Sequence, residues 1–113
     1  MSAKEVAILY YKLMMENNKE WLKTIRKSIR GQADKYGSSP YFWWDTRIKR
    51  VDKQKMSYKF KNEDPRFRTD RKAKFFFHRL DMDGKPSGSG QVPIHLIKDE
   101  EDNDEWRVDV SSW

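Results

Sequence analysis

The hydrophobic period of the chain changes at Pro40, and this change limits the folds that the chain can adopt. Before Pro40, apolar side chains recur at the three- and four-residue spacing of amphipathic helices, whereas after it they alternate in short runs divided by turn residues. The length of 113 residues suffices for one domain with a single core. The sequence therefore predicts one α+β domain over 1–113, with helices at about 3–30, a linker at about 31–40 and a sheet at about 41–113.

Two helices are predicted before the linker. A Ser-x-x-Glu capping box at Ser2 indicates that the first helix spans about 3–16. Two asparagines then interrupt the apolar pattern, which resumes over about 19–30 until Gly31 ends it. Both helices are expected to pack on one face of a curved sheet.

Alternating apolar and polar residues predict an antiparallel meander of about five strands, because every connection between the runs is short. The tetrapeptide that begins at Asp81 indicates a hairpin turn and not a calcium loop, since Arg79 stands where a calcium ligand is needed. In the last strand, Trp106, Val108 and Val110 share the buried face. The expected strands occupy about 42–52, 55–61, 66–80, 90–98 and 105–112.

The register of the hairpin that joins 66–80 to 90–98 follows from its apolar pattern. Only an odd sum of opposed residue numbers brings the apolar positions of both strands to one core face, namely Ala73, Phe75, Phe77, Val92, Ile94 and Leu96. With a loop over 81–90, this register sets His78 opposite Pro93 and makes His95 its diagonal neighbour. The outer face then carries Phe76, His78, Leu80, His95 and Ile97.

Composition indicates a charged, soluble chain with an aromatic core. Hydrophobic residues make up 36% and charged residues 37%, which alone favours disorder, but five Trp, five Tyr and six Phe can bury large areas. The lack of Cys excludes disulfides and cysteine zinc sites. Because the chain shows neither a long apolar run nor a signal peptide, we expect it to be cytoplasmic as it stands, or extracytoplasmic if an export segment has been removed.

The order of elements resembles the nuclear transport factor 2-like superfamily, also called the cystatin-like α+β cone. The residues that carry the resemblance are the helical pair from Glu5 to Ile25 and the closing strand Glu-Trp-Arg-Val-Asp-Val over 105–110. The resemblance implies that the helices and a concave sheet enclose a conical pocket, which members use for catalysis, ligand binding or protein contacts. By analogy, it also implies an accessory module of a bacterial envelope or secretion-related protein.

An enzyme that uses the cone pocket is one alternative function. Enzymes of the resembled fold place carboxylates, histidines and tyrosines in the cone, and the residues of this chain that could stand there are Tyr10, Tyr11, Asp45 and Tyr58. The assigned inward positions are apolar instead, so the sequence favours a non-catalytic domain without a cofactor. His78 and His95 have no third ligand at a suitable spacing, so no metal site is predicted.

A basic stretch supports a second alternative, a module that binds polyanions or single-stranded nucleic acid. Residues 45–74 contain 12 Lys and Arg against 5 acids, interleaved with aromatic residues. The candidate anion surface consists of Arg47, Lys49, Arg68, Lys72 and Lys74. No nucleic-acid motif accompanies these residues, so a solvated basic face is the favoured interpretation. The acidic run over 99–105 is likewise expected to be a solvated loop.

The outer sheet face provides the main functional prediction. Phe76, Leu80 and Ile97 are large apolar residues on a face that should be polar in a monomer, and two histidines lie beside them. We predict a non-catalytic binding or assembly domain that forms a homodimer, or binds another protein, through Phe76, His78, Leu80, His95 and Ile97.

Overall fold

A computed structural model describes all 113 residues, and the predicted α+β class is confirmed. Helical segments occupy the first half of the chain and a four-stranded sheet the second half. In chain order, the elements are α1 (Ala3–Met15), two 3₁₀ segments (Lys19–Thr24 and Lys27–Gln32), α2 (Ser39–Arg47) with a π-helical continuation (Ile48–Lys53), β1 (Ser57–Glu63), β2 (Lys72–Leu80), β3 (Pro86–Asp99) and β4 (Glu105–Ser111).

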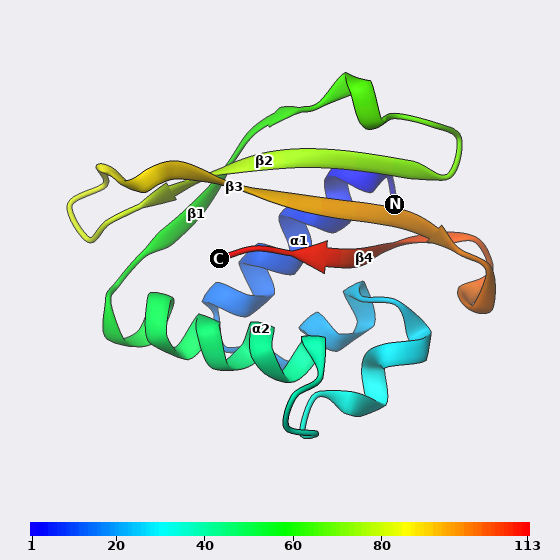
Figure 1. The fold of residues 1–113 in the computed structure, drawn as a ribbon, viewed down its shortest axis with the longest axis horizontal. Coiled ribbons are helices and arrows are strands. Elements are labelled where there is room, and N and C mark those ends of the chain that lie inside the picture. The colour runs from blue at the N-terminus through cyan, green and yellow to red at the C-terminus, as the bar shows by residue number, and fades with distance from the viewer.

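The sheet is an antiparallel meander in the order β1-β2-β3-β4. Helix α1 crosses one face of this sheet, and α2 lies beyond the β4 edge (Figure 1). At that edge, Ile25 forms a parallel bridge with Val108, and the Arg26 amide donates to the Val108 carbonyl at 3.1 Å. The segment between the two 3₁₀ stretches therefore covers the edge of β4, while β1 forms the other edge of the sheet.

The first helix begins and ends close to its predicted limits. The Ser2 hydroxyl accepts from the Glu5 amide at 3.2 Å, and the Glu5 carboxylate accepts from the Ser2 amide at 2.8 Å, which confirms the capping box. Its buried face follows the helical period and consists of Ala3, Val6, Ala7, Tyr10, Tyr11 and Met14. These residues supply the helical side of the core.

The prediction of one regular helix over 19–30 is wrong. This stretch forms two 3₁₀ segments, and Ile25 between them is extended and fully buried. The apolar spacing correctly predicts a buried face for this stretch. The backbone of Ile25 is not helical, however, because it pairs with β4. A tertiary contact thus overrides the local preference for an α-helix.

The predicted strand over 42–52 is also wrong, because these residues belong to α2 and its π-helical continuation. The Ser38 hydroxyl caps the helix by accepting from the Tyr41 amide at 3.2 Å, and Pro40 stands in the first turn. The aromatic run has high β-propensity, but buried positions recur at helical spacing, at Pro40, Trp43 and Arg47. The sheet therefore has four strands and not five.

The odd register between β2 and β3 is confirmed, since Phe75 pairs with Ile94 and Phe77 with Val92. The finer alignment differs by two residues, because His78 lies opposite Gln91 and not Pro93. An irregularity between His78 and Leu80 lets Leu80 pair with Pro86, so that 86–90 belongs to β3 and not to the loop.

The turn between β2 and β3 is the predicted hairpin turn. The Asp81 carboxylate accepts from the amides of Asp83 at 2.9 Å and Lys85 at 3.0 Å, and Gly84 has a positive φ of 77°. The strand expected from residue 66 begins only at Lys72, because Pro65–Phe67 forms a 3₁₀ turn.

The layer between α1 and the sheet is filled by aromatic side chains. The Tyr11 ring lies 5.3 Å from Tyr58, 4.4 Å from Phe77 and 5.0 Å from Trp113, measured between ring centroids. These residues belong to a core cluster of 18 buried residues that also includes Phe75, Ile94 and Val108. Aromatic packing of this kind adds to the stabilisation from area burial.

Candidate functional site

The five residues of the predicted interface lie on the sheet face opposite α1, where they are spread along β2 and β3. Phe76, His78 and Leu80 alternate along β2 with Phe75 and Phe77, which are core residues, and with Arg79, and the other two lie on β3. All five are partly exposed, and we call them the outer sheet patch: Phe76, His78, Leu80, His95 and Ile97.

Val110 extends the outer sheet patch onto β4, which the sequence did not predict. The register shifts between His95 and Leu96, so that His95 pairs with Val110 while Leu96 pairs with Val108. Val108 therefore faces the core, whereas Val110 turns outward with 48% of its surface exposed. Simple alternation of residues predicts the wrong face for Val110 because this register shift, a β-bulge, interrupts the alternation.

His95 has charged neighbours on both adjacent strands. It pairs with Lys74 on β2, and its ring meets the Phe67 ring edge-on at 5.9 Å. Burial, followed by the Lys74 charge, lowers the pKa of His95, and Asp109 partly opposes this. A hollow of about 200 Å³ beside it is lined by Phe67, Lys72, Ala73, His95, Leu96, Ile97 and Asp109.

The two histidines are farther apart than the sequence predicted. His78 pairs with Gln91, four residues before His95 on β3, so the expected diagonal contact is absent. The structure gathers no three His, Asp or Glu side chains in a position to hold a metal ion.

Most of the candidate anion surface is already paired with carboxylates. Lys49 bonds Asp45 at 3.1 Å. Arg68 bonds Glu63 through two contacts, at 2.7 and 3.0 Å. Lys74 lies 3.8 Å from Asp64 and 4.4 Å from the centre of the Phe67 ring. Lys72 has no ion-pair partner and is exposed, so these side chains do not form one continuous set of free cations.

Arg47 does not belong to that surface, because only 1% of the residue is exposed. Its guanidinium donates to both carboxylate oxygens of Asp52, at 2.7 and 2.8 Å, and to the Met14 carbonyl. It also lies 4.7 Å from the centre of the Trp44 ring. This arginine connects the end of α1 to α2.

The tyrosines that an enzyme in the cone could use are buried in the core. The Tyr10 hydroxyl hydrogen-bonds the Ser111 hydroxyl at 2.6 Å, and the Tyr11 hydroxyl donates to the Ser112 carbonyl at 2.8 Å. The Tyr58 hydroxyl is buried without a partner, and burial raises its pKa to about 12 despite the charge of Arg79. Burial also raises the pKa values of Tyr10 and Tyr11.

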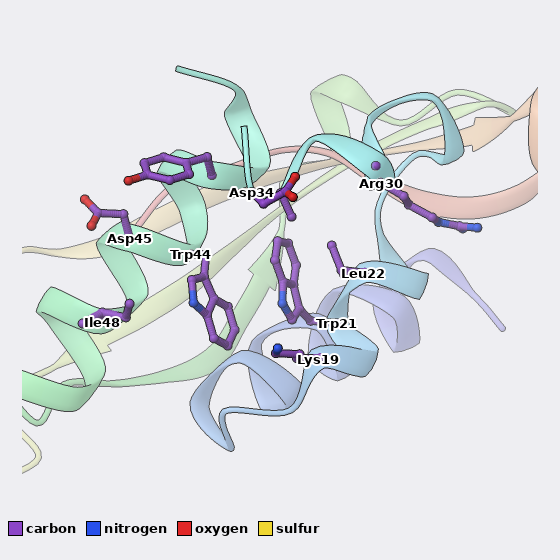
Figure 2. Close-up of a pocket in the computed structure, with 11 residues that line it drawn as sticks. Lys19, Trp21, Leu22, Arg30, Asp34, Trp44, Asp45 and Ile48 are labelled. Carbon is purple, nitrogen blue, oxygen red and sulfur yellow. The ribbon is translucent and has the colours of Figure 1, made fainter. Parts of the chain in front are cut away.

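Asp45 lies apart from these tyrosines, on α2, beside a groove that the sequence did not predict (Figure 2). This groove has a volume of about 610 Å³ and is formed by the first 3₁₀ segment, the residues around the second, and α2. We call it the Trp groove, and its lining residues are Lys19, Trp21, Leu22, Arg30, Gly31, Ala33, Asp34, Tyr41, Trp44, Asp45 and Ile48.

Two stacked indoles form the apolar part of the Trp groove. The rings of Trp21 and Trp44 are nearly parallel, with 9° between their planes and 5.7 Å between their centroids. The sequence analysis did not place Trp44 beside Trp21, because it predicted a strand over 42–52, where the structure has α2. The helix signals at Ser38 and Pro40 could have revealed it.

Two members of the acidic run are fixed by hydrogen bonds to other segments, contrary to the expected solvated loop. Asp99 is buried and accepts from the Lys27 amide at 2.8 Å. Asp102 accepts from Arg107 at 2.8 Å and pairs with Arg30. Hydrogen bonds from Arg107 and then Arg30 hold the pKa of Asp102 below its ordinary value, although burial opposes them. Arg30, which lines the Trp groove, therefore already has Asp102 as its ion-pair partner.

None of the helices has the length and apolar character needed to cross a membrane. Comparisons of the chain with known protein families, with functionally described proteins and with solved structures find no match.

Proposed function

We propose that this chain is a non-catalytic assembly domain that pairs with a second copy of itself through the outer sheet patch. The observation that carries the proposal is the sheet face opposite α1, on which the large apolar side chains Phe76, Leu80, Ile97 and Val110 are at least partly exposed. Exposed apolar side chains of this size on one sheet face favour a surface that a protein partner covers.

Two nearby charges are compatible with such a contact because each has an internal partner. Lys74 is close to Asp64, and Arg107, on β4, bonds Asp102. A neutralised cation at the edge of an apolar contact opposes association less than a free cation does. Lys72, which lies opposite Ile97 on the same face, is an exposed cation there without such a partner.

Two further features support the non-catalytic part of the proposal. The hydroxyls of Tyr10 and Tyr11 form hydrogen bonds with residues at the C-terminal end of the chain. Aromatic rings fill the layer between α1 and the sheet. The likeness to the nuclear transport factor 2-like cone, with helix α1 across an antiparallel sheet, remains part of this proposal. The assignment to a bacterial envelope or secretion-related protein stays a prediction.

The polyanion alternative receives less support from the geometry. Of its five candidate residues, Arg47 is buried and three others have carboxylate partners. Ion pairs of this kind reduce the free positive charge that binding to phosphate groups requires.

The test is the oligomeric state of the wild type and of two matched variants in sedimentation velocity. Phe76→Glu places a charge in the proposed contact, and Phe42→Glu places one on α2 at a phenylalanine that is 63% exposed. At about 100 μM, we expect the wild type and Phe42→Glu to dimerise and Phe76→Glu to be a folded monomer by circular dichroism. A monomeric wild type, or equal dimerisation of both variants, would overturn the proposal.

A further inference from the structure

We propose that a hollow at the start of α2 binds a small quaternary ammonium compound, of which choline is the simplest example. The hollow has a volume of about 410 Å³ and adjoins the Trp groove, with which it shares Tyr41 and Asp45. We call it the tyrosine hollow, and its lining residues are Tyr36, Gly37, Ser38, Ser39, Tyr41, Phe42, Trp43 and Asp45. Figure 1 shows the start of α2 away from β2 and β3, so this inference does not depend on self-association.

Three aromatic side chains of the tyrosine hollow have free ring surface. Tyr36 is 87% exposed, Phe42 is 63% exposed, and Tyr41 is partly exposed. In contrast to Trp44, none of these three rings has a lysine or arginine of the chain over its face. A cationic ligand can therefore reach ring surface that the chain itself does not cover.

Tyr36 and Tyr41 form a corner in the tyrosine hollow. Their ring centroids lie 5.5 Å apart, and their planes meet at 67°. A cation is attracted to the face of an aromatic ring when it lies within roughly 6 Å of the ring centroid. A cation in the angle between these two rings can meet that condition for both of them.

The backbone before α2 sets Tyr36 beside Tyr41 before any ligand binds. The Ser38 amide donates to the Lys35 carbonyl at 3.1 Å, and Gly37 within this turn has a positive φ of 89°. A preformed corner loses little conformational freedom on binding, so more of the contact energy appears as affinity.

The charged and polar groups of the tyrosine hollow disfavour an anion. Asp45 is its one charged lining residue, and the pair of Asp45 with Lys49 is exposed and therefore weak. The start of α2 also offers few free donors, because Pro40 has no amide hydrogen and the Ser38 hydroxyl already accepts from the Tyr41 amide. The charge of the hollow therefore favours a cation.

The shortage of free hydrogen-bonding groups favours a methylated ammonium over a bare ammonium or a sugar. The Ser38 hydroxyl is used twice, since it accepts from the Tyr41 amide and donates to the Gln32 carbonyl at 2.6 Å. A sugar or a bare ammonium needs several hydrogen bonds to replace those it makes with water. A quaternary ammonium group needs none, because its charge is surrounded by methyl groups that contact aromatic rings.

The experiment compares choline with two probes that each lack one of its features. 3,3-Dimethyl-1-butanol has the same shape without the charge, and ethanolamine has the charge without the methyl groups. Binding is followed by NMR through the ring signals of Tyr36 and Tyr41, with Phe67, which is 45% exposed and lies under Lys74, as the internal reference. We expect choline to bind with a dissociation constant on the order of 1 mM and the other two about fivefold more weakly.

A fourth probe separates a free cation from a lipid headgroup. Phosphocholine carries the same trimethylammonium group together with a phosphate. No lysine or arginine lines the tyrosine hollow to receive that phosphate, so phosphocholine should bind more weakly than choline.

Two substitutions of one residue separate the aromatic ring from its apolar surface. Tyr36→Phe keeps the ring and should bind choline as the wild type does. Tyr36→Leu keeps an apolar side chain without a ring, so it should weaken choline by about threefold and leave 3,3-dimethyl-1-butanol unchanged. Phe67→Leu is the matched control and should change neither affinity. Tyr36 and Phe67 are exposed, so these substitutions should not disturb the fold.

Four outcomes would overturn the proposal. The first is no saturable shift of the Tyr36 and Tyr41 signals with choline up to about 10 mM, and the second is an equal shift of the Phe67 signal. The third is that 3,3-dimethyl-1-butanol or phosphocholine binds as tightly as choline. The fourth is that Tyr36→Leu binds choline as tightly as Tyr36→Phe does.

Discussion

Arg47 and Asp52 form a two-bond ion pair in which the guanidinium is buried and the carboxylate is 46% exposed. The same guanidinium donates to the Met14 carbonyl near the end of α1. The pair therefore holds α2 and its π-helical continuation against α1. Because Trp44 lies over the guanidinium, this contact also supports one wall of the Trp groove.

Removal of the Asp52 charge should destabilise the fold. Asp52→Asn leaves a buried guanidinium without its counter-ion, so we expect the free energy of unfolding to fall by about 1–3 kcal/mol in urea titration. Asp45→Asn breaks only the exposed pair with Lys49 and should cost less than about 0.5 kcal/mol. Equal effects of the two substitutions would show that the buried pair has no special role.

The hydroxyls of Tyr58 and Tyr10 should contribute differently to stability. Tyr58→Phe removes a buried hydroxyl that has no partner, so the free energy of unfolding should stay unchanged or rise by up to about 1 kcal/mol. Tyr10→Phe deletes the hydrogen bond with Ser111 and should cost about 1 kcal/mol. A clear loss in Tyr58→Phe would mean that its hydroxyl has a partner, such as an ordered water.

Gly88 should tolerate no side chain, in contrast to Gly31. Gly88 has a φ of 62°, and an added Cβ would meet the Arg79 guanidinium, which donates to the carbonyls of Ser87 and Trp113. Gly88→Ala should therefore destabilise the fold by more than about 1 kcal/mol. Gly31→Ala meets no atom within 4 Å and should be neutral or slightly stabilising. Thermal unfolding of both variants measures the difference.

The ion pairs of Asp102 should make the protein sensitive to acid. Since the folded pKa of Asp102 is lowered, its contribution is complete above the ordinary carboxyl pKa and disappears as the pH falls through the folded value. Asp102→Asn should cost about 2 kcal/mol at neutral pH and flatten the acid limb of the stability curve. Asp83→Asn, at an exposed turn position, is the control and should leave the curve unchanged.

The sequence could predict elements whose pattern is set locally or by pairing with a neighbouring strand. The Ser2–Glu5 box marks the start of α1, and the alternation of Phe75 and Phe77 with polar residues sets the odd register of β2 and β3. Two features could not be predicted from the sequence because each is caused by a residue that is distant in the chain. Ile25 is extended through its pairing with Val108, and the bulge of β4 turns Val110 outward.

The two candidate sites differ in the same way, since one follows from the local sequence pattern and the other depends on residues that are distant in the chain. The outer sheet patch could be assembled by counting along two strands, because side chains on one face recur every second residue. The Trp groove depends on Trp21 and Trp44, which lie far apart in the chain and meet only when 39–47 is a helix. An aromatic run of high β-propensity led to the prediction of a strand there, although Ser38 and Pro40 indicate the start of a helix.

Dimerisation through the outer sheet patch should weaken as the pH falls. The pKa of His95 is lowered from its ordinary value of 6.5 by burial and then by Lys74, with Asp109 opposing, and a second subunit would bury His95 further. The dimer then binds fewer protons than two monomers, so its dissociation constant should rise as the pH falls below 6.5. Sedimentation equilibrium at about pH 7.5 and pH 5.5 measures this rise, and His95→Gln should abolish most of it. A dissociation constant that does not change with pH in the wild type, or one that changes equally in His95→Gln, would exclude His95 as the group responsible.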